Sequence, residues 1–173
     1  MNINGAIISF GSKDIIILHY GELGLMKHDN PYHKEGNLIT HINMVVSEVK
    51  KHNPSNELLI AALFHDIGKI KVKKHSEEKG WYVYHGHEKH SEEMFREIYV
   101  QYNLDKQEET IDLEHVCFLI RNHHKIDNLT QYMKHPRRKK SKEILDSPYL
   151  SELILLRKCD GLGRIPQQKG GME

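Results

Sequence analysis

Apolar residues recur every three or four positions along most of the chain, which is the spacing of one face of an α-helix. Ile39, Ile42 and Val45, for example, share such a face. Residues 71–90 are too polar for this pattern and are expected to form a loop, and Pro148 can break the last helix. The pattern predicts helices over residues 37–53, 57–64, 91–103, 111–123 and 141–162. The sequence therefore predicts an all-α fold.

The second of these helices is apolar nearly all round between Leu58 and Phe64, which indicates an element at the centre of the protein. Ser55 precedes it and has the side chain of a typical helix N-cap. The helix ends at His65 and Asp66. Two strongly polar groups at the end of a buried helix are costly unless another group compensates them.

Residues 1–25 are the only part of the chain rich in β-formers. Two short apolar runs there, separated by a Gly-Ser pair, favour either a hairpin or a pair of irregular helical turns. We expect an N-terminal extension over residues 1–30, one helical domain over residues 31–164 and a flexible tail over residues 165–173.

The composition fits one globular domain of 173 residues with a net charge of +1, which excludes neither a nucleotide nor a protein partner. No apolar run approaches the roughly 18 to 20 residues that span a bilayer, and the first residues do not resemble a signal peptide. We therefore expect a cytoplasmic protein without a membrane partner. Cys117 and Cys159 lie in apolar segments without paired spacing and are expected to be reduced core residues.

Histidine is the unusual residue of this chain, with 14 copies. His41 lies in the apolar stripe of the first predicted helix, and Asp160 lies on the inward face of the last one, four residues after Leu156. A divalent cation would compensate these groups together with His65 and Asp66. Imidazole and carboxylate ligands suit Mn, Fe, Co, Ni, Zn or Mg.

The string His65-Asp66-Ile67-Gly68-Lys69, with His41 before it and Asp160 after it, resembles the HD superfamily of metal-dependent phosphohydrolases. Further strings within residues 30–41, 85–91 and 160–164 are similar to the HD domain of bacterial tRNA nucleotidyltransferases. The resemblance implies a compact HD-type helical bundle. Only about thirty residues precede the first string, so no polymerase domain and no nucleotide addition to tRNA are expected.

The resemblance also implies roles for individual residues. His41, His65, Asp66 and Asp160 would be the primary metal ligands. His87 and His123 would bind a second ion, with His124 as the alternative to His123, or would bind phosphate and donate protons in a site with one ion. The implied catalytic residues are Asp66, Lys69, His87 and His123, and the implied substrate-binding residues are Lys69, Arg121, Arg164 and His33.

These residues imply a hydrolase in which one or two divalent ions activate water for attack on phosphorus. The resemblance favours a 2′,3′-cyclic phosphodiesterase or phosphatase acting on nucleotides or RNA ends. A nucleotidase or nucleoside-triphosphate hydrolase, and a noncatalytic nucleotide-binding sensor, are the alternatives. The basic run over residues 134–142 is expected to be a loop that either attracts a nucleic-acid backbone or is simply solvated, and a homodimer is left open.

Overall fold

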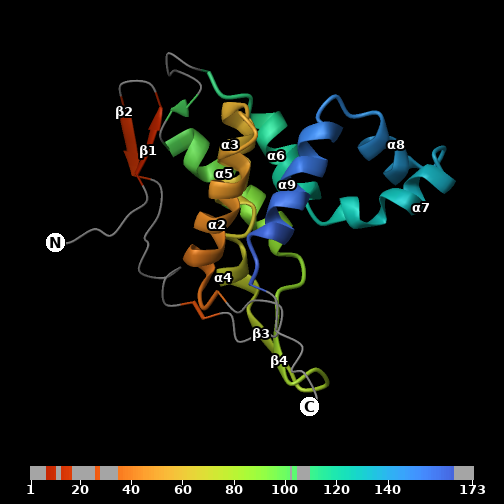
Figure 1. Cartoon of the computed structure of the whole chain (residues 1–173), viewed down its shortest axis with the longest axis horizontal. Coiled ribbons are helices and arrows are strands. Elements are labelled where there is room, and N and C mark those ends of the chain that lie inside the picture. The colour runs from red at the N-terminus through yellow and green to blue at the C-terminus, as the bar shows by residue number, and fades with distance from the viewer. Residues whose placement is uncertain are drawn as a thin grey trace.

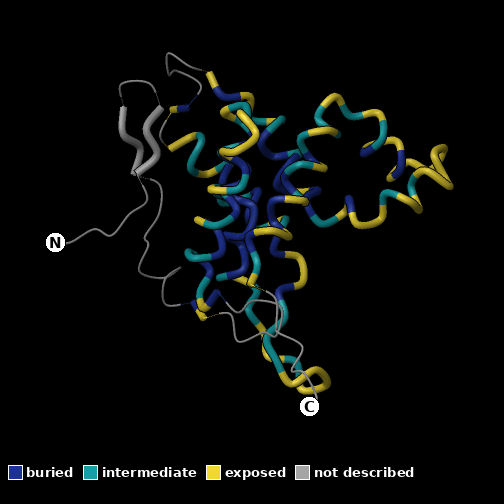
Figure 2. The backbone as a smooth tube through the Cα atoms, in the orientation of Figure 1, coloured by how far each residue is buried: buried dark blue, intermediate teal, exposed yellow. Residues whose placement is uncertain are grey.

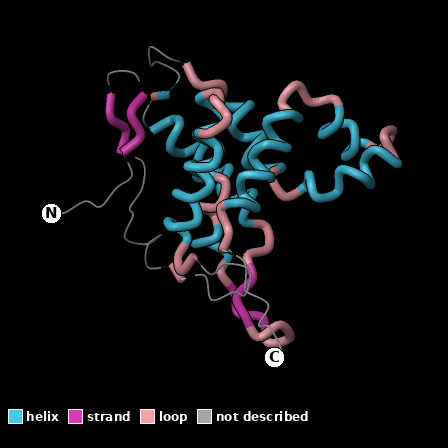
Figure 3. The backbone as a smooth tube through the Cα atoms, in the orientation of Figure 1, coloured by secondary structure: helices cyan, strands magenta, loops and turns pink. Residues whose placement is uncertain are grey.

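The computed structural model of the chain describes residues 7–10, 13–16, 26–27, 35–101, 103–104 and 110–165. Most of these residues are helical, which confirms the predicted fold class (Figures 1 and 3). The α-helices are α2 (Leu38–Lys50), α3 (Asn56–Phe64), α4 (Lys69–Val72), α5 (His87–Gln101), α6 (Leu113–Asn122), α7 (Leu129–Lys134), α8 (Lys139–Leu145) and α9 (Leu150–Leu162). A 3₁₀-helix, η2, spans Lys125–Asn128.

Helix α3 lies at the centre of the bundle and packs against α2, α5, α6 and α9 (Figure 1). Its apolar residues face the interior on nearly every side, and Figure 2 shows buried backbone concentrated in this region. Ala61 and Phe64 are fully buried. The predicted central helix is therefore confirmed, and its last turn delivers the polar residues that follow it into the protein interior.

Side-chain caps define where α2 and α3 begin. Asn37 accepts a hydrogen bond from the backbone N–H of Thr40 (2.9 Å) at the start of α2. Ser55 accepts one from the backbone N–H of Leu58 (3.1 Å) at the start of α3, as predicted. These bonds satisfy amide groups that have no partner within the helix. The Ser55 cap is a local signal, which explains why the start of α3 could be read from the sequence.

The predicted loop over residues 71–90 is wrong in three places. Helix α4 occupies its beginning, strands β3 (Lys74–Ser76) and β4 (Trp81–Val83) form an antiparallel hairpin, and α5 begins at His87 rather than at Ser91. Tyr82 and Ile70 pack against the core and anchor a segment whose composition is otherwise polar. Because α5 begins early, His87 stands on a rigid helical turn.

Two other segments complete the described structure. Strands β1 (Ile7–Phe10) and β2 (Lys13–Ile16) pair antiparallel, so the hairpin is the alternative that the structure shows for the N-terminal segment. The last predicted helix is broken into α8 and α9 beside Pro148. The basic run expected as a loop partly forms α8, and α7 and α8 project from the bundle (Figure 1). No helix among the described residues is long and apolar enough to cross a membrane.

Gly68 sets the distance between the end of α3 and the start of α5. Its backbone N–H donates a hydrogen bond to Ser91 Oγ (2.9 Å). A Cβ atom at this position would lie 2.3 Å from the carbonyl oxygen of His87 and 2.4 Å from the amide nitrogen of Ser91. Both are backbone atoms of α5 and cannot rotate away. The glycine therefore permits the contact that brings His87 beside Asp66.

We expect the substitution Gly68→Ala to lower the free energy of unfolding by about 3 kcal/mol, since a methyl group must displace packed backbone. For a chain of this size the loss corresponds to a fall in Tm of about 6–12 °C. The matched control is Gly161→Ala in α9, where an added Cβ meets nothing within 4 Å. The control should change stability by less than about 1 kcal/mol. Equal effects of the two substitutions in urea unfolding would contradict this role of Gly68.

Candidate metal centre

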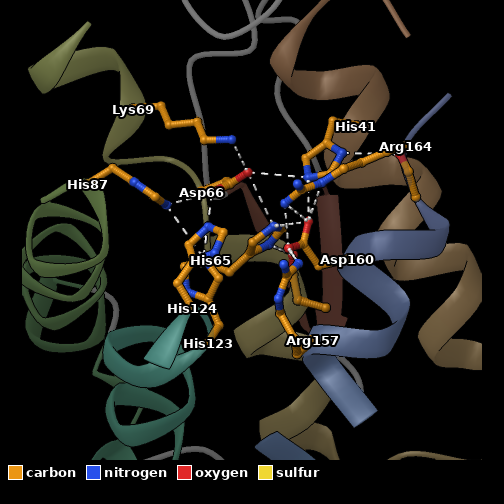
Figure 4. A network of polar contacts seen from close by, with 12 residues as sticks. His41, His65, Asp66, Lys69, His87, His123, His124, Arg157, Asp160 and Arg164 are labelled. Carbon is orange, nitrogen blue, oxygen red and sulfur yellow. Dashed lines mark hydrogen bonds and ion pairs between the residues drawn. The ribbon is translucent and has the colours of Figure 1, made fainter. Parts of the chain in front are cut away.

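Two groups of His and Asp side chains meet at Asp66 (Figure 4). In the first group, Asp66 Oδ2 lies 3.2 Å from His41 Nε2 and 3.3 Å from His65 Nε2. Asp160 Oδ1 lies 3.1 Å from the same His41 nitrogen. All four residues are buried. We call His41, His65, Asp66 and Asp160 the inner cluster.

The second group lies on the other oxygen of the same carboxylate. Asp66 Oδ1 is 2.9 Å from His87 Nε2 and 3.7 Å from His123 Nε2. His124 offers a further ring nitrogen close to these atoms. We call Asp66, His87, His123 and His124 the outer cluster. One carboxylate thus connects two sets of ligand atoms. Within each set, the atoms lie within 4.8 Å of one another.

These side chains come from five parts of the bundle. His41 stands on α2 and Asp160 on α9, whereas His65 and Asp66 follow the last residue of α3. His87 is the first residue of α5, and His123 is the C-cap of α6. The helices that pack around α3 therefore bring their polar residues to the end of that helix.

Backbone carbonyl groups orient the four buried histidine rings. In each ring Nδ1 lies within hydrogen-bond distance of a main-chain oxygen, while Nε2 faces the carboxylates. The Nδ1 partners are Gly163 O for His41 (3.1 Å), Ala62 O for His65 (2.8 Å), Tyr84 O for His87 (2.8 Å) and Ile120 O for His123 (2.7 Å). A neutral ring that donates from Nδ1 presents the Nε2 lone pair, which is the arrangement of a metal-ligating histidine.

The electrostatics of the inner cluster also suit a cation. Burial raises the pKa of Asp66, but the Lys69 ammonium and His65 outweigh it and hold that pKa well below the usual value. Burial lowers the pKa of His41, yet hydrogen bonds with Asp160, Asp66 and Glu35 raise it to about 10. A proton on His41 thus supplies positive charge among the buried carboxylates. A divalent cation would supply this charge and use the same nitrogen as a ligand.

The donor set passes a test of fit for a metal. His65 Nε2 is buried and forms no hydrogen bond with any residue that the structure describes. A buried nitrogen without a hydrogen bond lowers the stability of the fold unless another partner, such as a metal ion, binds it. Since the ring already uses Nδ1 on Ala62, Nε2 has the correct lone pair for an ion. The inner cluster therefore fits a divalent metal bound by two imidazoles and two carboxylates.

Burial also changes the histidines of the outer cluster. It lowers the pKa of His124 to about 2, and the neighbouring His123 acts in the same direction. Burial and the neighbouring His65 lower the pKa of His123 as well. For His87, burial lowers the pKa but the contact with Asp66 outweighs it, so the pKa rises. His123 and His124 are thus neutral at ordinary pH, as ligands must be.

Lys69 and Arg164 lie at the cluster, as their predicted substrate roles require. Lys69 Nζ donates to Asp66 Oδ2 (2.6 Å), and Arg164 Nη2 donates to Asp160 Oδ2 (2.7 Å). Arg121 lies outside both clusters and pairs with Glu92, which is buried. His33 lies outside the described residues. Its implied role in binding the substrate stays a prediction.

Sequence reasoning missed two residues that support the ligands. Glu35 is buried, and its Oε1 atom lies 3.2 Å from His41 Nδ1. Arg157 Nη1 donates to Asp160 Oδ2 (2.7 Å). Arg157 stands three residues before Asp160 on one helix face, a spacing that could have revealed it. No sequence pattern links Glu35 to His41, because Glu35 precedes α2 and the contact depends on how the chain turns into that helix.

A cavity of about 340 Å³ opens beside the outer cluster. Lys69, His87, His124 and Arg164 line it together with residues of the β3–β4 hairpin. Three of its lining residues are cationic in ordinary solution, namely Lys69, Lys79 and Arg164, and Glu88 is its one acidic residue among those described. The cavity therefore offers a positively charged approach to the ligand cluster.

Comparison with known protein families matches residues 32–164 to the HD domain family. The chain belongs to the HD domain family. A search of curated proteins found no match. The family together with the buried His and Asp clusters makes this chain a metal-dependent phosphohydrolase. The predicted HD bundle and the predicted enzyme class are thus confirmed, while the resemblance to the tRNA nucleotidyltransferase branch stays a prediction.

We expect Glu35→Gln to weaken binding of the inner-cluster metal about 10-fold, because a carboxylate behind a ligating histidine orients the ring and raises its basicity. The carbonyl of Gly163 still holds the ring, so the loss should lie at the low end of such effects. Metal affinity is measured by competition with a chromophoric chelator. The control is Glu48→Gln on α2, whose carboxylate pairs with Lys51. Equal metal affinity in the two variants would show that Glu35 does not support metal binding.

Proposed function

We propose that this enzyme hydrolyses a nucleotide phosphoester with two divalent ions, one in each cluster, joined by Asp66. The observation that carries the proposal is the shared Asp66 carboxylate, because each of its two oxygens faces a separate set of possible metal ligands. A cavity lined by cationic side chains lies beside them. The ion identity is open among Mn, Fe, Co, Ni, Zn and Mg, because His and Asp ligands suit all of them.

Bound ions would polarise the phosphoester and lower the pKa of a coordinated water. The chain itself supplies the remaining functions. Lys69 lies 2.6 Å from Asp66 and also lines the cavity, so its ammonium can offset charge on a bound phosphate. Arg164 donates a hydrogen bond to Asp160 and also lines the same cavity. Neutral His124 lies at the outer cluster and can complete the ligand set.

The preferred substrate in this proposal is a 2′,3′-cyclic phosphate or a phosphomonoester on a nucleotide or an RNA end. Support comes from the strings within residues 30–41, 85–91 and 160–164, which resemble the HD domain of bacterial tRNA nucleotidyltransferases. A nucleotidase or nucleoside-triphosphate hydrolase would use the same site and is the second candidate. A noncatalytic sensor is disfavoured because both ligand sets are complete.

Ligand substitutions should separate the two ions. We expect Asp66→Ala to lose both metals and at least about 10³-fold in activity, since it removes the carboxylate that both clusters share. His87→Ala should retain the inner ion only. The matched control is His90→Ala, a more exposed histidine on the same helix that pairs with Glu93. Elemental analysis of protein without a His tag gives the metal content, and an unchanged content in Asp66→Ala would contradict the shared site.

Substrate class is tested by a hydrolysis screen supplemented with each metal. The set contains 2′,3′-cyclic nucleotides, mononucleotides, nucleoside triphosphates and short RNAs ending in a cyclic phosphate. We expect the cyclic substrates to be cleaved fastest. Turnover no greater than that of Asp66→Ala on every substrate would refute the enzymatic proposal.

The same screen tests whether RNA is the polymer substrate. The six cations in residues 134–142 are exposed, and no acidic residue interrupts them. If they hold an RNA backbone, activity on the oligonucleotide should fall steeply between about 50 and 200 mM salt while activity on the mononucleotide does not. Equal salt dependence of the two substrates would restrict the enzyme to free nucleotides.

A further inference from the structure

The β3–β4 hairpin forms one wall of the cavity beside the outer cluster. Lys79, Trp81 and Val83 line that wall, whereas Lys69, His87 and Arg164 are among the residues that complete the cavity. Figure 1 shows the hairpin projecting from the bundle next to α4. The cavity is thus lined by an aromatic and an aliphatic side chain as well as by groups that suit a phosphate.

The alternation of side chains along β4 separates Trp81 from the core. Successive residues of a strand point to opposite faces. Tyr82 packs partly against the core, and its ring also contacts the exposed cross-strand residue His75 at 5.3 Å between ring centroids. Trp81 and Val83 lie on the other face and line the cavity. Trp81 is half-buried and is not among the described side chains packed against the hydrophobic core.

The chemistry of the cavity restricts what could fill it. A phosphosugar without a base would use Lys69 and Arg164 but would make no stacking contact with Trp81. A lipid chain would place its methylene groups against several charged side chains, which is unfavourable. A nucleobase would complement the aromatic wall, because every base has a π-face that can stack on tryptophan. A volume of about 340 Å³ lies at the small end of ligand sites and suits one nucleotide rather than a duplex.

We propose that Trp81 is the base-binding residue of this enzyme, and that its substrate is a single nucleotide unit whose base stacks on Trp81 while its phosphate lies toward Lys69 and Asp66. This inference rests on the proposed phosphohydrolase function and names the recognition element of its substrate. The nucleotide unit is either free or the last residue of an RNA chain, because both present the same base and phosphate to the cavity.

The chain contains one tryptophan, so its fluorescence reports directly on this wall. The metal-loaded protein is titrated with a nucleoside 3′-monophosphate, with ribose 5-phosphate and with inorganic phosphate. We expect saturable quenching by the nucleotide only. Quenching by a short RNA with the same terminal phosphate would support the proposal and identify the chain end as the source of the base. Equal responses to all three small ligands, or no response to any nucleotide, would overturn it.

Kinetics of two variants distinguish base recognition from a structural role. Trp81→Ala should raise KM for a 2′,3′-cyclic nucleotide about 10- to 100-fold with little change in kcat. Its effect on KM for glycerol 1,2-cyclic phosphate, which has no base, should be much smaller. Trp81→Phe, which keeps an aromatic face, should recover most of the affinity. Equal losses on both substrates, or no rise in KM for the nucleotide, would overturn the proposal.

Failure of this proposal differs from failure of the proposed function. If the wild-type protein hydrolyses no phosphoester but nucleotide quenches Trp81 fluorescence, base recognition is supported and the hydrolase assignment fails. If the wild-type protein hydrolyses cyclic nucleotides and Trp81→Ala does so with the same KM, the hydrolase assignment holds and the role of Trp81 is refuted. Thermal unfolding of both variants, which should match the wild type, excludes loss of the fold as the cause.

Discussion

The burial of the Asp66 carboxylate is the constraint on which the site depends. The residue is 1% exposed, and a charged carboxylate is unfavourable in such a place unless cationic or hydrogen-bonding groups surround it. Lys69 and His65 provide that compensation from nearby in the chain. His41 and His87 provide it from α2 and α5. The need to satisfy one carboxylate thus explains why several helices carry polar residues into the core.

The packing of the bundle converts this constraint into two separate ligand sets. Helix α3 is apolar on almost every side, so α2, α5, α6 and α9 can surround it and approach its C-terminal end. Gly68 lets α5 come close enough to place His87 on the outer oxygen of Asp66. The inner oxygen meets His41 and His65 instead. The geometry of α3 relative to α5 therefore supports a second ion as well as the first.

Much of the candidate site could be predicted because its signals are local. The adjacent His65 and Asp66 end a buried apolar helix, and the inward faces of two other helices identify His41 and Asp160. The structure brings these four together in the inner cluster. The choice between His123 and His124 could not be made from the sequence, and the structure places both in the outer cluster. The position of Arg121 could not be predicted from the sequence, because its pairing with Glu92 depends on how α5 packs on α6.

The sequence alone predicted the helical fold class, the Ser55 cap, the central position of α3 and the four residues that meet in the inner cluster. Each of these follows from the period of apolar residues or from neighbours within one helical turn. Only the tertiary structure decided that Glu35 supports His41 and that the β3–β4 hairpin forms a wall of the cavity. These relations join segments through packing, or depend on a few anchoring aromatic residues in a polar stretch. No periodic pattern along the chain encodes them.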